Sequence, residues 1–238
     1  MANSNIEWTN ETWNPVTGCT KISSGCKNCY AEKFAKRLKA MKNKRYKNGF
    51  SVTLHWDKIE DPLKWRKPRF VFVNSMSDLF HKKVPLKFIK SVFYTIKKAD
   101  NHIFQILTKR SSRLKQVAGD LDWPENLWIG VSVENQDNIN RIEDLRQVPS
   151  EVKFISFEPL IGPITNFSLD KINWVIVGGE SGTKARPIKA SWVRIIRDRC
   201  QQEEIPFFFK QWGGRTPKAG GRTLDGKIWD EYPEHDIV

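Results

Sequence analysis

Short apolar runs alternate with amphipathic helical patterns along most of the chain, and this alternation limits the fold more than any other feature. The runs are mostly continuous and rich in Val, Ile and Phe, as are strands buried on both faces of a parallel sheet. Their alternation with helices predicts βαβ units. The predicted strands are residues 51–56, 69–74, 102–107, 127–133, 153–157, 174–177 and 206–210, with one more near 12–18, and the predicted helices are 31–38, 85–98, 111–118, 135–146 and 191–203.

Repeated alternation predicts an incomplete (β/α) barrel of about six to eight mostly parallel strands. A Rossmann sheet is disfavoured, because no Gly-x-Gly-x-x-Gly follows the first strand. The length of 238 residues suits a single domain, residues 1–238, with one sizeable core. Residues 213–238, rich in Gly, Lys and acids, are predicted to form a C-terminal arm on the outside of that domain.

Polar side chains follow six of the predicted strands. Because parallel strands place their carboxyl ends at one edge of the sheet, these groups are expected to converge on one face, where α/β folds bind ligands. A polar helix cap is the simpler explanation for any one of them alone. The groups are 74–78, 108–110, Glu134 with Asn135, Glu158 with Pro159, 178–181, and Gln211 with Trp212.

Three of the four cysteines are crowded into eleven residues, in the pattern Cys-x6-Cys-x2-Cys formed by Cys19, Cys26 and Cys29. Such crowding predicts a metal site rather than a disulfide scaffold. With a fourth ligand such as His55, His81 or Cys200, the thiolates would form a closed zinc site. Without one, they suit a 4Fe-4S cluster with one open iron. We favour the cluster, because only the last two cysteines have the short spacing of a zinc ligand pair. Cys200, in a helical pattern, is predicted to be a buried structural thiol.

The cysteine loop resembles that of radical S-adenosylmethionine (SAM) enzymes, including the spore photoproduct lyase branch: it follows a first strand, ends in Cys-x2-Cys-Tyr and leads into a helix. Nearly the whole chain also resembles a phage-associated three-cysteine-motif family of unassigned reaction. The runs that carry this second resemblance are 14–19, 25–31, 157–160, 178–182 and 209–213.

The radical SAM resemblance implies a 4Fe-4S cluster on the three cysteines, with SAM on the fourth iron. Reduction by an electron donor would cleave SAM to methionine and a 5′-deoxyadenosyl radical. By the same resemblance, Gly178, Gly179 and Glu180 would approach the methionine amino group. Glu134 or Glu158 would bind the ribose hydroxyls, and Lys109 or Arg110 the methionine carboxylate.

The chain carries a net charge of +13, which favours a polyanionic partner. Residues 27–69 hold 14 basic and four acidic side chains, with aromatic residues between them. Cations for phosphates and rings for bases predict a nucleic-acid surface there, although a solvated helix face would look the same. The polar start of the chain and the lack of any apolar stretch near the roughly 20 residues of a membrane span predict a soluble, cytoplasmic protein.

The sequence therefore predicts a radical SAM-type enzyme that acts on a nucleic acid or nucleotide, in phage-associated modification or repair. The small barrel leaves one side that a partner protein could cover. One alternative is a zinc-dependent nucleic-acid-binding protein without catalysis. Another is an iron-sulfur glycosylase or nuclease-like enzyme that does not use SAM. A hydrolase is disfavoured, since the sequence has no His-x-x-x-His, nucleophile elbow or P-loop.

Overall fold

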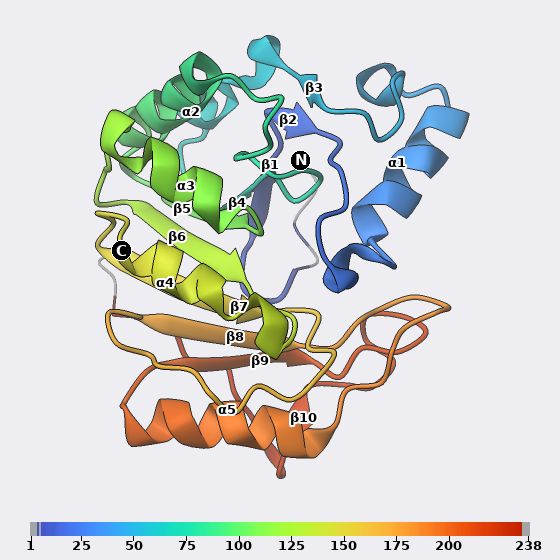
Figure 1. Cartoon of the computed structure of the whole chain (residues 1–238). Helices are drawn as coiled ribbons and strands as arrows, with labels where there is room; N and C mark the ends of the chain where they lie inside the picture. Colours follow the sequence, from blue (N-terminus) through green and yellow to red (C-terminus); the bar gives the residue numbers. More distant parts are fainter. Residues whose placement is uncertain (1–3, 5, 235–238) are drawn as a thin grey trace.

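The computed structural model describes residue 4 and residues 6–234, and its main feature is a seven-stranded parallel sheet curved into half a barrel (Figure 1). The strand order is β1-β4-β5-β6-β7-β8-β9, so strands that follow one another in the sequence from β4 to β9 lie side by side. This confirms the predicted incomplete α/β barrel. The strands are β1 (Glu11–Trp13), β4 (Phe70–Val73), β5 (Ile103–Thr108), β6 (Leu127–Ser132), β7 (Val152–Phe157), β8 (Trp174–Gly178) and β9 (Phe207–Gln211).

Helices connect most of these strands and pack against the outer face of the sheet. Helix α1, which follows the cysteines, is not part of this layer and stands apart from the sheet (Figure 1). The five helices are α1 (Tyr30–Ala40), α2 (Leu86–Lys98), α3 (Ser111–Val117), α4 (Asn140–Arg146) and α5 (Ala190–Gln202), and the single turns of 3-10 helix are η1 (Ser24–Cys26), η2 (Lys44–Tyr46), η3 (Trp56–Lys58), η4 (Asp61–Lys64), η5 (Ala118–Asp120) and η6 (Gln136–Asn138).

Two predicted strands differ from what the structure shows. The run near 12–18 is interrupted at Pro15, which lacks a backbone N–H, and it divides into β1 and β2 (Val16–Thr17). The run 51–56 forms only β3 (Thr53–Leu54), which pairs antiparallel with β2 outside the main sheet. Both residues of β3 are only half-buried, so this segment lacks the two covered faces of the barrel strands.

The sheet separates two hydrophobic layers because successive strand residues point to opposite faces. In β4, Val71 and Val73 face the helices, whereas Phe72 belongs to the inner layer. The inner layer consists mainly of aromatic rings and fills the concave side of the half-barrel. Its buried members are Trp8, Phe72, Ile103, Trp128, Phe154, Trp174, Ile176 and Phe208.

The C-terminal segment lies along β9 and contributes to both layers. The backbone N–H of Phe209 donates to the carbonyl oxygen of Trp229 at 2.9 Å, and Phe208 forms an antiparallel bridge with Asp230. Trp229 packs in the helix layer, while the ring of Tyr232 stacks on Trp174 in the inner layer. Before this, β10 (Thr223–Leu224) and β11 (Lys227–Ile228) form a short hairpin. Residues 1–3, 5 and 235–238 of the predicted domain and arm lie outside the described residues.

Within the described part of the chain, no helix combines the length and apolar character that crossing a membrane requires.

Candidate functional site

Polar side chains at the carboxyl ends of the barrel strands form a connected network. Asp78, in the loop after β4, accepts hydrogen bonds from Thr108 Oγ1 at 2.8 Å and from the backbone N–H of Lys109 at 3.2 Å. The Lys109 ammonium lies 3.2 Å from Glu134 Oε1, after β6, and donates to the backbone oxygen of Glu158, after β7, at 3.3 Å. The expected convergence of strand ends is therefore confirmed.

Glu158 extends the network to the last two strands. Its Oε1 lies 3.1 Å from the ammonium of Lys210 on β9, and its Oε2 accepts from Ser156 Oγ at 3.0 Å. Gly178, at the end of β8, leaves room for this carboxylate, since a Cβ there would lie 2.5 Å from Glu158 Oε1. The side chain of Glu158 keeps 14% of its surface exposed, so it can still reach a ligand.

Glu134 is the most buried charge of the network, with no exposed surface. Arg141 of α4 donates to its Oε2 at 2.8 Å, while Ser23 Oγ and Lys109 bind its Oε1. Burial, the largest single influence, raises the pKa of Glu134, but Lys109, Arg141 and Ser23 together bring that pKa below its ordinary value. The carboxylate is therefore ionised at neutral pH, held by two cations and one hydroxyl.

The cysteine loop (residues 18–29) lies across this network and is bound to it at several points. Thr20 accepts from Arg110 Nη2 at its backbone oxygen and at its Oγ1, at 2.9 and 3.0 Å. Ser23 donates to Glu134 at 2.6 Å, and Asn28 Nδ2 donates to Glu180 Oε2 at 2.9 Å. The loop is thus fixed to the ends of three strands, β5, β6 and β8, that are distant in the sequence.

The three cysteines of this loop are free thiols of intermediate exposure. Arg110 Nη2 lies 3.8 Å from Cys19 Sγ, and Ser23 Oγ lies 3.7 Å from Cys26 Sγ. Burial, followed by the nearby Asp78 carboxylate, raises the pKa of the Cys19 thiol to about 11 against the opposing effect of Arg110. Cys29 caps the first turn of α1 without a side-chain hydrogen bond.

The residue types of the loop fit an iron-sulfur cluster, because three cysteines on one short segment are the usual ligands of such a group. Its position also fits, since it covers the strand ends where α/β barrels bind ligands. Across residues 4 and 6–234, however, no group of three or more His, Cys, Asp or Glu side chains is arranged to hold a metal ion.

Glu180, just after β8, binds both the cysteine loop and Arg186, which lies six residues further along the chain. Arg186 grips the carboxylate with Nε at 2.9 Å from Oε2 and Nη2 at 2.6 Å from Oε1, and its Nη1 donates to the backbone oxygen of Ser24. Burial raises the pKa of Glu180, but the hydrogen bonds from Arg186 and Asn28 outweigh it and lower that pKa. Gly179 packs against the Trp212 backbone too closely for any side chain.

The histidines considered as a fourth metal ligand have other partners. His55 Nε2 lies 2.9 Å from Thr17 Oγ1. His81 is fully buried, and its Nδ1 accepts from the backbone N–H of Lys83, so its Nε2 carries the proton and donates to Thr20 Oγ1 at 2.9 Å. Burial, aided by Arg110, lowers the pKa of His81 to about 4. Cys200 is buried in the helix layer, which confirms the prediction of a structural thiol.

Sequence reasoning missed several residues that hold the site together. Arg141 was predicted only as part of a helix, and Arg186 lies in a loop with no motif around it. A weak signal existed for Arg141, which is a cation beside the apolar residues Ile142 and Leu145 on the buried face of α4. The chain offers no comparable signal for Arg186 or for the loop residue Asn28.

Gly25 provides a test of how closely the loop lies on Glu134. A Cβ at Gly25 would be 2.3 Å from Glu134 Cγ, a distance that forces either the loop or the carboxylate to move. Gly25→Ala is therefore expected to lower the free energy of unfolding by about 1–3 kcal/mol. Equilibrium urea denaturation measures this change.

Gly119→Ala is the matched control, because nothing lies within 4 Å of a Cβ at that position. It is expected to leave stability unchanged or slightly raised, by less than about 1 kcal/mol. Equal stability of the two variants would show that the loop does not press on Glu134.

One family model matches almost the whole chain. The family is described as "Protein of unknown function (DUF5131)", and the match covers residues 3–233. No curated protein and no solved structure matches the sequence.

Proposed function

Because the chain belongs to the DUF5131 family of proteins of unknown function, its activity has to be inferred from its own site, and we propose a radical SAM-type iron-sulfur enzyme acting on a nucleic acid or nucleotide. One observation carries the proposal. The loop that contains Cys19, Cys26 and Cys29 is hydrogen-bonded across the carboxyl ends of β5, β6 and β8, through Arg110, Glu134 and Glu180. A loop used only to staple the N-terminal segment would not need to cover the ligand-binding edge of a barrel.

In this proposal the three cysteine thiolates would hold three irons of a 4Fe-4S cluster, and the fourth would be left for SAM. When bound and reduced by an external electron donor, the cluster would supply the one electron that cleaves SAM to methionine and a 5′-deoxyadenosyl radical. The protein contributes position and charge. Arg110 holds the loop through Thr20 and directs an N–H toward Cys19 Sγ, which stabilises a thiolate at that position.

Among the acidic side chains, Glu158 is the better candidate for binding ribose hydroxyls, because part of its carboxylate is exposed. Glu134 has no exposed surface and already binds Ser23, Lys109 and Arg141. Its role is to position the loop. The Lys109 ammonium lies between the Glu134 carboxylate and the backbone oxygen of Glu158, where it can receive the carboxylate of the cofactor.

The proposal is tested by anaerobic reconstitution with iron and sulfide, followed by absorbance and spin-resonance spectra of the dithionite-reduced protein with and without SAM. We expect cluster absorbance in the unmodified chain and a spin-resonance signal that changes when SAM is added. Cys19→Ala is expected to lose most of the bound iron, because a two-cysteine loop cannot complete the cluster.

Cys200→Ala is the control, since it removes a thiol that is buried in the helix layer away from the loop. It should take up as much iron as the unmodified chain. Tightly bound zinc without a cluster would refute the enzyme and favour the zinc-dependent binding protein. A cluster whose signal ignores SAM would refute the SAM-dependent reaction and favour an iron-sulfur glycosylase or nuclease-like enzyme.

A further inference from the structure

Helix α1, which follows the cysteine loop, exposes two aromatic rings to solvent. Its buried side is formed by Ala31 and Ala35, whereas Tyr30 and Phe34 are 56% and 47% exposed. These two rings are four residues apart and therefore lie on the same face of the helix. The hydroxyl of Tyr30 donates to the backbone oxygen of Ser75 in the loop after β4, so this face borders the strand ends.

The same helix carries cations that lack acidic partners. Lys33, Arg37 and Lys39 are exposed, and the ion pairs identified among the described residues include none of them. The one acidic residue of the helix, Glu32, is already paired with Lys21 and Lys36. We call Tyr30, Lys33, Phe34 and Arg37 the helix bank.

A second set of cations lies on the loops after β8 and β9, on the same side of the sheet as α1 (Figure 1). Residues 181–189 and 213–223 contain no acidic side chain. Three of their exposed cations, Lys184, Arg215 and Lys218, have no ion-pair partner among the described residues, and we call these three the loop bank. The two loops are joined by backbone hydrogen bonds from Gly182 to Gly214 and from Gly214 to Glu180.

Beside the loop bank lies a hollow of about 420 Å³ lined by Gly182, Thr183, Ala185, Gly214 and Arg215. The Lys33 ammonium of the helix bank lies 3.2 Å from where a Cβ at Gly182 would be. Positive charge is therefore continuous from α1 to the loops and borders the cysteine loop, whose Asn28 donates to the backbone oxygen of Lys184.

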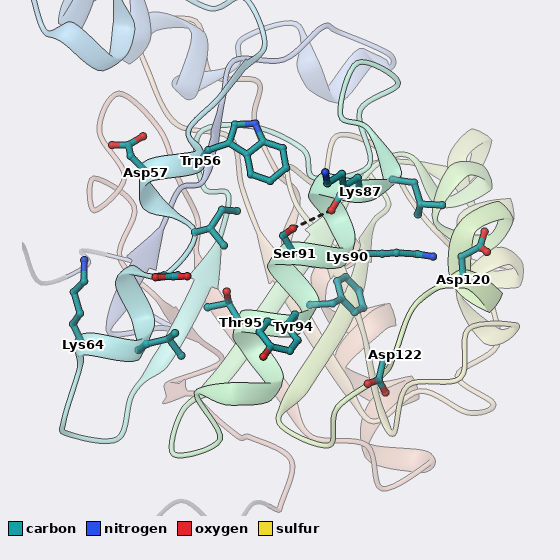
Figure 2. Close-up of a pocket in the computed structure, with 15 residues that line it drawn as sticks. Trp56, Asp57, Lys64, Lys87, Lys90, Ser91, Tyr94, Thr95, Asp120 and Asp122 are labelled. Carbon is teal, nitrogen blue, oxygen red and sulfur yellow. Dashed lines mark hydrogen bonds between the residues drawn. The ribbon is translucent and has the colours of Figure 1, made fainter.

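Residues 56–64 of the basic segment 27–69 lie at a different groove, away from the two banks. Residues of η3 and η4 line a groove of about 970 Å³ against α2, which Figure 2 shows. Three lysines line this groove, but so do four acids, Asp57, Glu60, Asp120 and Asp122. Its charge does not favour a polyanion, so this groove adds nothing to the nucleic-acid surface predicted for residues 27–69.

We propose that a single-stranded polynucleotide binds along the helix bank and the loop bank. Its phosphates contact Lys33, Arg37 and the loop-bank cations, and its bases stack on Tyr30 and Phe34. Exposed rings among cations are what single strands require, whereas a duplex keeps its base faces covered. Only the statement that this strand is the substrate rests on the proposed function; binding itself requires no metal on the cysteines.

The test measures fluorescence anisotropy of a labelled oligothymidylate and an oligouridylate of about 20 nucleotides, and of a duplex of the same length, over a salt series. We expect at least one of the two single strands to bind more tightly than the duplex. Neutralising the loop bank with Lys184→Gln and Arg215→Gln together should weaken binding by about tenfold and reduce the salt slope by about 1.4.

The matched control is Lys87→Gln with Lys90→Gln, which removes the same charge from the groove at α2. It should change affinity less than about twofold. Phe34→Ala should weaken single-strand binding at least about fivefold, whereas Tyr30→Phe, which keeps the ring, should not. Circular dichroism and the midpoint of thermal unfolding confirm that each variant is folded.

Equal weakening by the α2 control would overturn the location, and equal affinity for the duplex would overturn the single-strand preference. Single-strand binding that is unaffected by Phe34→Ala would show a general anion site instead. The two proposals fail separately: a protein that binds the strands but takes up no iron refutes the enzyme and leaves this surface, and the reverse result refutes this surface alone.

Discussion

Glu134→Ala is expected to lower the free energy of unfolding by about 3–5 kcal/mol, because it leaves two buried or nearly buried cations without their carboxylate. Arg141 has 8% of its side chain exposed and Lys109 has 21%, so water cannot replace the lost partner fully. The cysteine loop also loses the hydrogen bond from Ser23. Urea denaturation at pH 7 measures the change.

The same contribution depends on pH. The folded-state pKa of Glu134 lies below its ordinary value of 4.5, so the stabilisation is complete above that pH and is lost as the pH falls through the folded-state pKa. As the pH is lowered from about 5 through the folded-state pKa of Glu134, the free energy of unfolding of the unmodified protein should therefore fall more than that of the Glu134→Ala variant.

Glu143→Ala is the matched control, because Glu143 lies on α4, the helix that carries Arg141. Glu143 pairs with Arg146 at the surface, where its side chain is 65% exposed. Its removal should change the free energy of unfolding by less than about 1 kcal/mol. A comparable loss in both variants would mean that Glu134 contributes nothing beyond a surface ion pair.

Trp174→Ala is also expected to lower the free energy of unfolding by about 3–5 kcal/mol, because it opens a cavity at the centre of the inner layer. Trp174 is fully buried, and its ring centroid lies within about 6 Å of the rings of Trp128, Phe154, Phe208 and Tyr232. Its indole N–H also donates to the backbone oxygen of Glu231 at 2.8 Å. A fall in thermal midpoint on the order of 10 °C should accompany the loss.

Tyr94→Ala provides the comparison, because it removes an aromatic ring of similar size that is 63% exposed on α2. Tyr94→Ala should change the free energy of unfolding by less than about 1 kcal/mol. If Trp174→Ala were equally mild, the inner rings would not be packed as a core. The urea m-value should stay constant in both variants, since neither change alters the surface exposed on unfolding by much.

The barrel could be predicted because each of its strands from β4 to β9 is a mostly apolar run of four to six residues with polar side chains after it. The edge near β1 was harder to predict, since Asn14 and Pro15 end a three-residue strand whose partner, β4, lies some 60 residues further along the chain. Local patterns carry no information about that pairing.

The candidate site was predictable to the extent that its residues follow strands directly. Lys109, Arg110, Glu134, Glu158 and Glu180 all do, and the structure connects them in one network with the cysteine loop. Arg141 and Arg186 could not be found in this way. They act through long side chains that reach back to a carboxylate six or seven residues away, and a sequence does not show where such chains point.

The two ends of the described chain meet on the concave face of the sheet. Tyr232 stacks on Trp174 and its hydroxyl donates to the backbone oxygen of Glu7, next to Trp8 of the same layer. During synthesis, when the N-terminal part of a chain emerges first, this face stays open until Tyr232 has been made. Ribosome-bound intermediates that already contain β4 to β9 would expose the faces of Trp174 and Phe208 that Tyr232 covers, and exposed apolar surface of this kind favours aggregation of nascent chains.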